Sequence, residues 1–207
     1  MARPVNRFSS FLSSSMKTLS TALRKKTLDW FIDSAARLTG QRRKTEHQRG
    51  EADLTVAPLQ DRIGPENIGQ LVMYAYDPKH KATLPYYDVF PLVFPLEFYS
   101  DGWLGINLHY LPPVARAKLM DALYNLVENG ENGRTRIAAS YEILKGASKF
   151  RAFRPCLKRY LTSHARSKFM IVPYDKWDVT LSAPTARFMK ESEQRVWNDS
   201  LRAIERY

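Results

Sequence analysis

The sequence predicts an α+β fold, with a small antiparallel sheet packed with C-terminal helices and a helical N-terminal extension. Two observations lead to this fold class. Aromatic and β-branched residues punctuated by turn pairs occupy residues 69–111, and helix-spaced apolar residues follow them. A segment without hydrophobic residues, 41–50, separates this part from the N-terminus. We therefore expect a flexible arm (1–15), an amphipathic basic helix (16–40), a linker (41–60) and a compact α+β domain (61–207).

The N-terminal extension begins with a serine-rich arm, which is typical of a mobile segment. From Met16 to Leu38 apolar residues recur every three to five positions, which predicts an amphipathic helix that ends near Gly40. A helix of this length is marginal by itself in water, so we expect a partner to cover its apolar stripe. The predicted partner-binding residues are Leu19, Leu23, Leu28, Phe31, Arg24, Lys25 and Lys26.

The sheet is predicted from three apolar segments and the turns between them. Leu71–Tyr76 has the composition of a strand, and Asp77-Pro78 ends it. Val89–Tyr99 is also apolar but contains two prolines, which confine it to a sheet edge or require a bulge. Asp101-Gly102 is a hairpin signal, and Trp103–Tyr110 is expected to be the strand that follows it.

The chain after residue 110 is predicted to be mainly helical. Leu111-Pro112-Pro113 opens a helix that continues to about Gly130, because proline is tolerated in the first helical turn. Further helices are predicted over Thr135–Leu144, in the basic segment Lys149–His164 and near Lys190–Glu205, with an apolar patch at Phe169–Val172.

Positive charge is concentrated in two blocks of a chain whose formal net charge is +11. Residues 1–50 carry 11 Lys/Arg against 3 Asp/Glu, and residues 134–170 carry 10 against 1. Residues 51–133 between them carry 5 against 11, whereas residues 171–207 balance at 6 against 6. Such segmentation predicts attraction either to a polyanion or to acidic protein surfaces, and it does not choose between them.

Composition excludes several classes of protein. No apolar run approaches the roughly 18 residues of a membrane span, and no signal-peptide core follows the basic N-terminus. We therefore expect a protein of the cytosol or one packaged from it. The single cysteine, Cys156, cannot form an internal disulfide and is expected to be a small core residue. Four scattered histidines give no zinc-ligand spacing.

The basic block from Lys145 to Phe169 is the most informative functional segment, because its cations alternate with aromatic residues. Cations contact phosphates, and the rings either stack on bases or pack the segment onto the core. A solvated helix face is the alternative interpretation. If the segment is helical, its spacing puts most of the four cations between Arg151 and Arg159 on one side. The predicted nucleic-acid-binding residues are Lys145, Lys149, Arg151, Arg154, Lys158, Arg159, Arg166 and Lys168.

A nuclease is the enzyme class that the acidic residues could support, because carboxylates on strands can hold Mg²⁺. The candidates are Asp77, Asp88, Glu97 and Asp101, with His80 and His109. None of them has a recognised metal-ligand spacing, and the sequence has no Gly-rich phosphate loop. Ser163-His164 offers no credible pairing of nucleophile and base. The sequence therefore predicts no catalytic residue, no metal and no cofactor, and a protein that is not an enzyme.

Three stretches of the sequence resemble one protein family. They are MYAYDPKHKATLPYYDVFPLVFPL, DGWLGINLHYLPP with the ARAKLMDALY that follows it, and SYEILKGASKFRAFRPCLKRYLTSHARSKFMIVPYDKWDVTLSAPTARF. They are similar to late virion proteins of T-even-like contractile-tailed phages, most closely the DNA end protector proteins. The resemblance extends from about Gly69 to Trp197 and leaves residues 1–60 outside. Its most distinctive parts, Tyr86-Tyr87-Asp88 and Gly105–Pro113, consist of hydrophobic and turn residues that build the fold.

The resemblance implies a structural virion protein that binds and protects the ends of packaged double-stranded DNA and takes part in head completion and head–tail joining. Its implied partners are DNA ends and neck, portal, tail or baseplate subunits of a symmetric assembly, put together in the host cytoplasm without a membrane. An alternative is a small hub or wedge component of the phage tail or baseplate that clips neighbouring subunits with its N-terminal arm. Both basic blocks face DNA under the first interpretation, whereas the arm is the site under the second.

Overall fold

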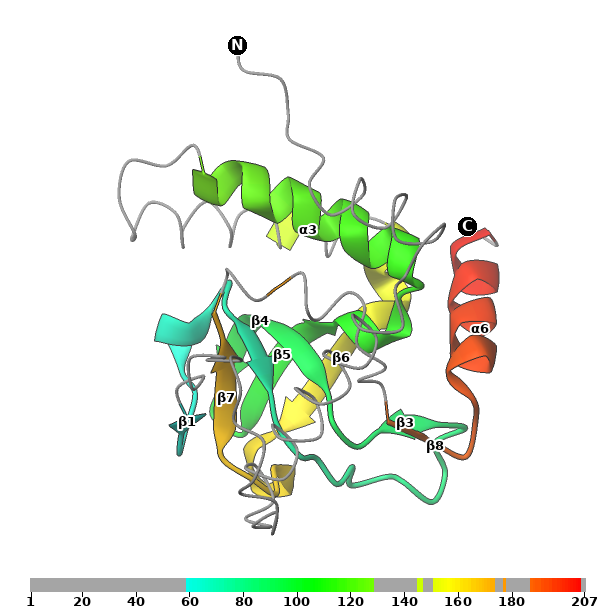
Figure 1. The fold of residues 1–207 in the computed structure, drawn as a ribbon. Helices are drawn as coiled ribbons and strands as arrows, with labels where there is room; N and C mark the ends of the chain where they lie inside the picture. Colours follow the sequence, from blue (N-terminus) through cyan, green and yellow to red (C-terminus); the bar gives the residue numbers. More distant parts are fainter. Residues whose placement is uncertain (1–58, 129–144, 147–150, 174–176, 178–186, 206–207) are drawn as a thin grey trace, which may run out of the picture.

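The computed structural model describes residues 59–128, 145–146, 151–173, 177 and 187–205 (Figure 1). The predicted N-terminal arm, basic helix and most of the linker lie outside these residues, as does the helix predicted over 135–144. The described part contains an antiparallel sheet and C-terminal helices, which confirms the predicted fold class.

The sheet has six strands in the order β1-β7-β2-β4-β5-β6, and every neighbouring pair is antiparallel. A second sheet of two short strands, β3 (Tyr87–Asp88) and β8 (Phe188–Met189), lies close to the start of helix α6 (Figure 1). The strands of the large sheet are β1 (Leu59–Gln60), β2 (Leu71–Met73), β4 (Leu92–Tyr99), β5 (Gly102–Asn107), β6 (Leu157–Leu161) and β7 (Phe169–Val172).

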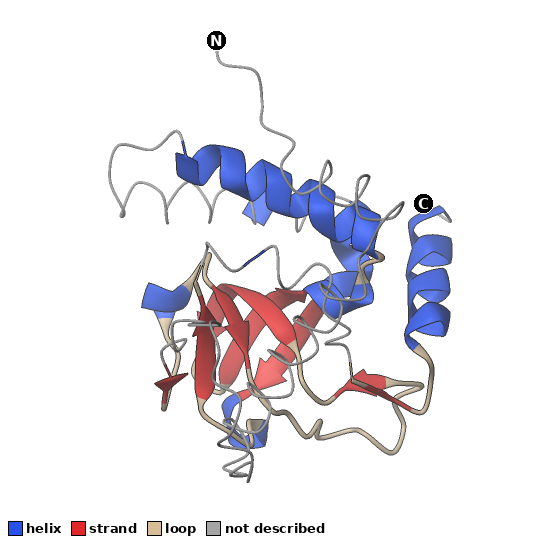
Figure 2. Cartoon of the chain, viewed as in Figure 1, coloured by secondary structure: helices blue, strands red, loops and turns tan. Residues whose placement is uncertain are grey.

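Two α-helices lie beside the sheet, α3 (Pro113–Glu128) and α6 (Glu193–Glu205) (Figure 2). Both were predicted, and α3 begins at the proline pair because proline is compatible with a first helical turn. Within the described residues, no helix is long and apolar enough to cross a membrane. Short 3₁₀ helices complete the fold: η1 (Pro65–Asn67), η2 (Leu108–Tyr110), η3 (Arg151–Cys156) and η4 (Thr162–His164).

The prolines of residues 89–99 predicted either an edge strand or a bulge, and strand β4 contains a bulge. It is a central strand between β2 and β5, and its register with β5 shifts between Pro95 and Glu97. Proline has no N–H to donate, so a bulge accommodates it inside the sheet. The bulge also changes the face of the sheet to which alternate side chains of β4 point. Phe94 lies opposite Ile106 on one face, whereas Phe98 lies opposite Trp103 on the other.

Apolar residues are buried on both faces of the sheet. The helix-side cluster joins alternate strand residues to α3 and α6, and it includes Leu71, Met73, Leu92, Phe94, Ile106, Ala117, Met120 and Val196. The aromatic cluster fills the other face with Val72, Tyr74, Tyr76, Val93, Trp103, Tyr160 and Phe169. Tyr74 lies at its centre, with ring centroids 5.4 Å from Trp103 and 5.0 Å from Phe169. Such ring pairs add to the stabilisation that burial alone provides.

One sequence-based expectation about the C-terminal half is wrong, and a predicted apolar patch there is a strand. The basic segment 149–164 was expected to be a helix, but its described residues form η3, strand β6 and η4. Pro155 has no N–H and interrupts helical hydrogen bonding, and β5 then offers a strand edge to Leu157–Leu161. Phe169–Val172 is strand β7. The sheet is therefore completed by strands that follow α3, not by the N-terminal half alone.

A substitution at Gly102 tests the pairing of β5 with β6. A Cβ at this position would lie 1.9 Å from the carbonyl oxygen of Tyr160, an approach that requires one of the two backbones to move. We expect Gly102→Ala to lower the free energy of unfolding by about 2 kcal/mol, measured by urea denaturation. Gly146→Ala is the matched control, since a Cβ there meets nothing within 4 Å. Equal stability of the two variants would contradict the described register.

Candidate nucleic-acid interface

Strand β6 separates two of the cations that were predicted to form one patch. Lys158 lies opposite Gly105, and its Nζ is 4.0 Å from the centroid of the Tyr110 ring. Burial lowers the pKa of Lys158. Arg159 lies opposite Leu104 on the other face and is exposed. Since successive side chains of a strand point to opposite faces, the predicted one-sided helical patch is wrong.

Four other predicted cations are described less fully or lie apart. Lys145 is exposed in a short helical segment, and Arg154 is exposed on η3. Arg151 begins η3, and Lys149 lies outside the described residues. Whether any of these residues binds nucleic acid stays a prediction.

The remaining cations gather around η4. Arg166 pairs with Asp77 at 3.6 Å, and the same carboxylate accepts a hydrogen bond from Lys81 at 2.8 Å. The Lys81 hydrogen bond lowers the pKa of Asp77. Lys168 lies 2.8 Å from Asp61. These ion pairs are exposed, so they contribute little to stability, and phosphate groups can compete for the same cations.

Backbone hydrogen bonds hold η4 between the β4–β5 turn and the end of β2. The N–H of Thr162 donates to the carbonyl of Asp101 at 2.9 Å, and the N–H of Asp77 donates to the carbonyl of His164 at 3.1 Å. The N–H of Arg166 donates to the carbonyl of Ala75 at 2.8 Å. We call the surface formed by Lys81, Arg159, Arg166 and Lys168 around these bonds the η4 corner.

Arg159 is the most firmly positioned cation of the η4 corner. Its Nη1 donates to the backbone carbonyls of Tyr160 at 2.5 Å and Trp103 at 3.3 Å, and its Nη2 pairs with Asp101. The guanidinium also lies over the ring of Tyr99, 4.4 Å from its centroid. A planar guanidinium with this many partners has little freedom to move.

The acidic residues weighed as nuclease candidates are not brought together. Asp77 and Asp101 lie in turns and pair with cations of the η4 corner, and Glu97 is exposed on β4. Among the residues that the structure describes, no group of three or more His, Cys, Asp or Glu side chains could hold a metal ion.

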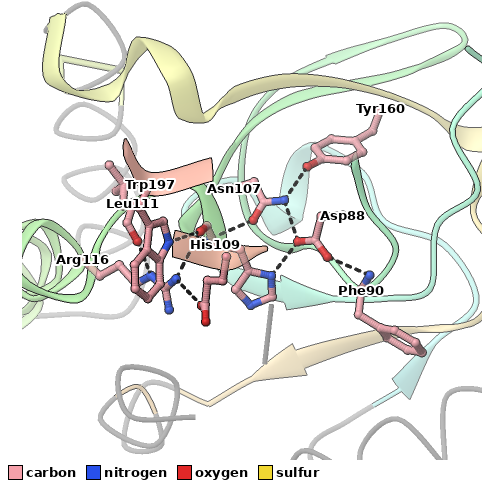
Figure 3. Close-up of polar contacts among 9 residues, drawn as sticks. Asp88, Phe90, Asn107, His109, Leu111, Arg116, Tyr160 and Trp197 are labelled. Atoms are coloured by element: carbon pink, nitrogen blue, oxygen red, sulfur yellow. Dashed lines mark hydrogen bonds and ion pairs between the residues drawn. The ribbon is translucent and has the colours of Figure 1, made fainter. Parts of the chain in front are cut away.

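Asp88 and His109 do meet, in a buried polar network (Figure 3). One oxygen of Asp88 accepts hydrogen bonds from His109 Nδ1 at 2.5 Å and Asn107 Nδ2 at 3.0 Å, and the other accepts from the backbone N–H of Phe90 at 3.0 Å. Asn107 Nδ2 also donates to the hydroxyl of Tyr160 at 3.1 Å. The network therefore connects β3, β5, η2 and β6.

A second buried cation extends the network towards the C-terminus. Arg116 of α3 donates from Nε to the carbonyl of Leu111 at 2.7 Å and from Nη2 to the carbonyl of His109 at 3.1 Å. Its Nη2 also lies 3.4 Å from Glu193 of α6. Trp197 donates to the same His109 carbonyl at 2.9 Å, so α6 is attached directly to this network.

The charges in this network have opposing influences on their pKa values. Burial alone would raise the pKa of Asp88, but the charge and hydrogen bond of His109, with the other two donors, outweigh it and leave the pKa lowered. Burial lowers the pKa of Arg116, and the charge of Glu193 opposes that shift. His109 and Arg116 are at most 2% exposed, and Asp88 is 4% exposed. These groups hold the fold and leave no room for a substrate.

Cys156 behaves as the sequence predicted. It is fully buried in the helix-side cluster. Burial raises the pKa of its thiol to about 12, so it is protonated at neutral pH and has little nucleophilic character. Sequence reasoning missed Arg116 and Tyr99, because the surroundings that give them a role come from distant strands and helices.

The fold and its surface define a small α+β domain with a basic corner around η4. A family model described as Phage T4 terminal DNA protecting protein matches residues 57–200, and the chain belongs to this family. The match confirms the resemblance inferred from the sequence, and it begins before Gly69. Comparison with curated proteins and with solved structures found no match.

Asp88→Asn tests the role of the buried carboxylate. The amide keeps one oxygen that accepts hydrogen bonds. Its NH₂ group takes the place of the second oxygen and then faces a donor whose hydrogen bond it cannot accept. We expect the free energy of unfolding at pH 7 to fall by about 3 kcal/mol, because a buried pair loses one partner. Asp77→Asn, which removes an exposed carboxylate, is the control and should leave stability nearly unchanged. A smaller loss of unfolding free energy in Asp88→Asn than in Asp77→Asn would contradict a stabilising role of the network.

The pH dependence follows from the direction of the Asp88 pKa shift. Its pKa in the folded protein is lower than the unfolded value of about 3.9, so the stabilisation is complete above that value. It is lost as the pH falls through the folded pKa. The stability difference between wild type and Asp88→Asn should therefore shrink below about pH 4, measured by urea denaturation at several pH values.

Proposed function

We propose that this protein binds the ends of packaged double-stranded DNA in a tailed-phage virion and shields them. The family match over residues 57–200 is the observation that carries this proposal, because the family is described as protecting terminal DNA. A protector of ends contacts DNA without regard to sequence. Phosphate contacts suit that task, since they supply affinity and orientation and read no bases.

The charges of the chain support the same proposal. The segment 134–170 carries ten cations and one acid, and its described part contributes Arg159, Arg166 and Lys168 to the η4 corner. All three cations pair with aspartates in the free protein. At Arg166 and Lys168, DNA phosphates would replace the exposed aspartate partners at small cost, because surface ion pairs are weak.

The wider role that we propose includes head completion and head–tail joining, with neck or portal subunits as partners in a symmetric virion assembly formed in the host cytoplasm. The N-terminal extension would dock on a neighbouring subunit through the apolar stripe of its predicted helix. The alternative role in the tail or baseplate depends on that extension, which lies outside the described residues. No described residue favours it over DNA-end binding.

The salt dependence of DNA binding tests which cations bind phosphates. We expect the triple variant Lys81→Gln, Arg166→Gln, Lys168→Gln, which removes three exposed cations of the η4 corner, to bind duplex DNA more weakly. The slope of log K against log salt should flatten by about 0.9 for each phosphate that the variant no longer neutralises. The matched control changes Lys118, Arg195 and Arg202 of α3 and α6 to Gln, which removes the same charge from exposed positions elsewhere.

The two variants separate a located interface from general attraction. Flattening in the first variant and an unchanged slope in the second would support the η4 corner as the DNA-binding surface. Equal flattening in both would mean that net charge alone attracts DNA. Failure of the wild-type protein to bind duplex DNA at low salt would contradict the proposed function.

An exonuclease assay tests protection itself. Linear blunt-ended duplex is incubated with the full-length protein and then with an exonuclease that starts at ends. We expect degradation to slow many-fold at saturating protein. Cleavage of the same DNA by a restriction endonuclease at a central site should be unaffected. Equal protection from both enzymes would indicate coating of the whole duplex, and no protection from either would overturn the proposal.

A further inference from the structure

We infer that the exposed part of the helix-side face of the sheet receives the terminal base pair of a DNA duplex, with Tyr99 and Arg159 as the stacking contacts. This inference rests on the proposed function, and it names the feature of the DNA end that the protein recognises. Four observations support it: the register of three strands, the fixed position of Arg159, the net charge of −1 that Glu97, Asp101 and Arg159 give the surface, and the cations beside it.

The register places one continuous face across β4, β5 and β6. Leu104 lies opposite Glu97 on one side and opposite Arg159 on the other, and it shares the face of Ile106 two residues along β5. Ile106 is fully buried in the helix-side cluster. Towards the β4–β5 turn the described residues of the same face are exposed: Glu97, Tyr99 (45% exposed) and Arg159.

Contacts within the sheet hold Tyr99 and Arg159 of this surface in position. Tyr99 projects from β4 and Arg159 from β6, the two strands on either side of β5, and the guanidinium lies 4.4 Å from the ring centroid. The backbone carbonyls of Trp103 and Tyr160 accept hydrogen bonds from Arg159, which fixes its plane. Aromatic rings and guanidinium planes on a sheet face are surfaces on which nucleic-acid bases stack.

The charge of this surface favours a base over a phosphate. The charge of Arg159 is compensated by Asp101, and Glu97 accepts a hydrogen bond from the hydroxyl of Tyr99. A compensated guanidinium attracts phosphate weakly, but its planar face remains available for stacking. Thr162, at the start of η4, donates a hydrogen bond to the β4–β5 turn. The cations that suit phosphates, Arg166 and Lys81, pair with Asp77 at the other end of η4.

The DNA end supplies the matching feature. Inside a duplex every base pair is covered on both faces by its neighbours, so a protein reaches only groove edges and phosphates. At an end, one face of the last base pair is open. Phosphate contacts alone cannot distinguish an end from the interior, whereas a stacking surface with cations beside it can bind both features of the end together.

Binding to two forms of one DNA tests the inference. The first probe is a short blunt-ended duplex, and the second has the same sequence with both ends closed by hairpin loops. The full-length wild-type protein should prefer the open duplex. Tyr99→Leu keeps an apolar side chain and removes the ring, and it should reduce this preference about 10-fold. Tyr99→Phe keeps the ring and should retain the preference.

Two further variants separate stacking from charge. Arg159→Lys keeps the charge but loses the plane, so it should reduce the preference for open ends more than the affinity for closed DNA. Lys168→Gln should weaken binding to both DNA forms by the same factor. Tyr99 is exposed, so its variants should match the wild type in thermal melting, and that measurement confirms that they fold.

The outcomes distinguish this inference from the proposed function. A wild-type protein without any preference for the open duplex would contradict the proposed function itself. A wild-type preference that survives unchanged in Tyr99→Leu would overturn only the stacking surface. If Tyr99→Leu binds DNA ends normally but no longer joins virion assemblies, the surface is a protein-docking site and the inference is wrong.

Discussion

The buried carboxylate of Asp88 imposes the constraint on which the rest of the structure depends, because a charge removed from water must be paired and hydrogen-bonded. Its partners come from the chain around it, from β5 and from η2, and Asn107 carries the network on to β6. The small β3–β8 sheet is thereby tied to the large one. Both carboxylate oxygens of Asp88 accept hydrogen bonds from these donors.

The carbonyl of His109 carries this constraint to the helices. Arg116 of α3 and Trp197 of α6 both donate to it, and Glu193 lies beside the guanidinium. Residues of both helices thereby join the helix-side cluster, in which Phe94 and Ile106 are buried. Near the β4–β5 turn, the described residues of the same face are exposed, Tyr99 and Arg159 among them.

Local signals predicted the parts of the fold that local chemistry decides. The Asp101-Gly102 turn and the beginning of α3 follow from backbone preferences of single residues, and both are observed. The prolines of residues 89–99 left a sheet edge and a bulge open, and a bulge is observed next to Pro95. Strand β6 was missed because Leu157–Leu161 becomes a strand only through pairing with β5, which lies fifty residues earlier in the chain. That error carried over to the candidate site, since a strand sends Lys158 and Arg159 to opposite faces. Function was predicted through family resemblance, because charge segmentation alone left DNA and acidic proteins as equal alternatives.

The central claim is that DNA ends bind at the β4–β5 turn and the η4 corner, and hydrogen–deuterium exchange of the full-length protein tests it most directly. Exchange is measured with and without a blunt-ended duplex. The account predicts slower exchange in residues 99–104 and 159–168 when DNA is present, with little change in α3 and α6. Slower exchange confined to α3 or α6, with residues 99–104 and 159–168 unchanged, would contradict it.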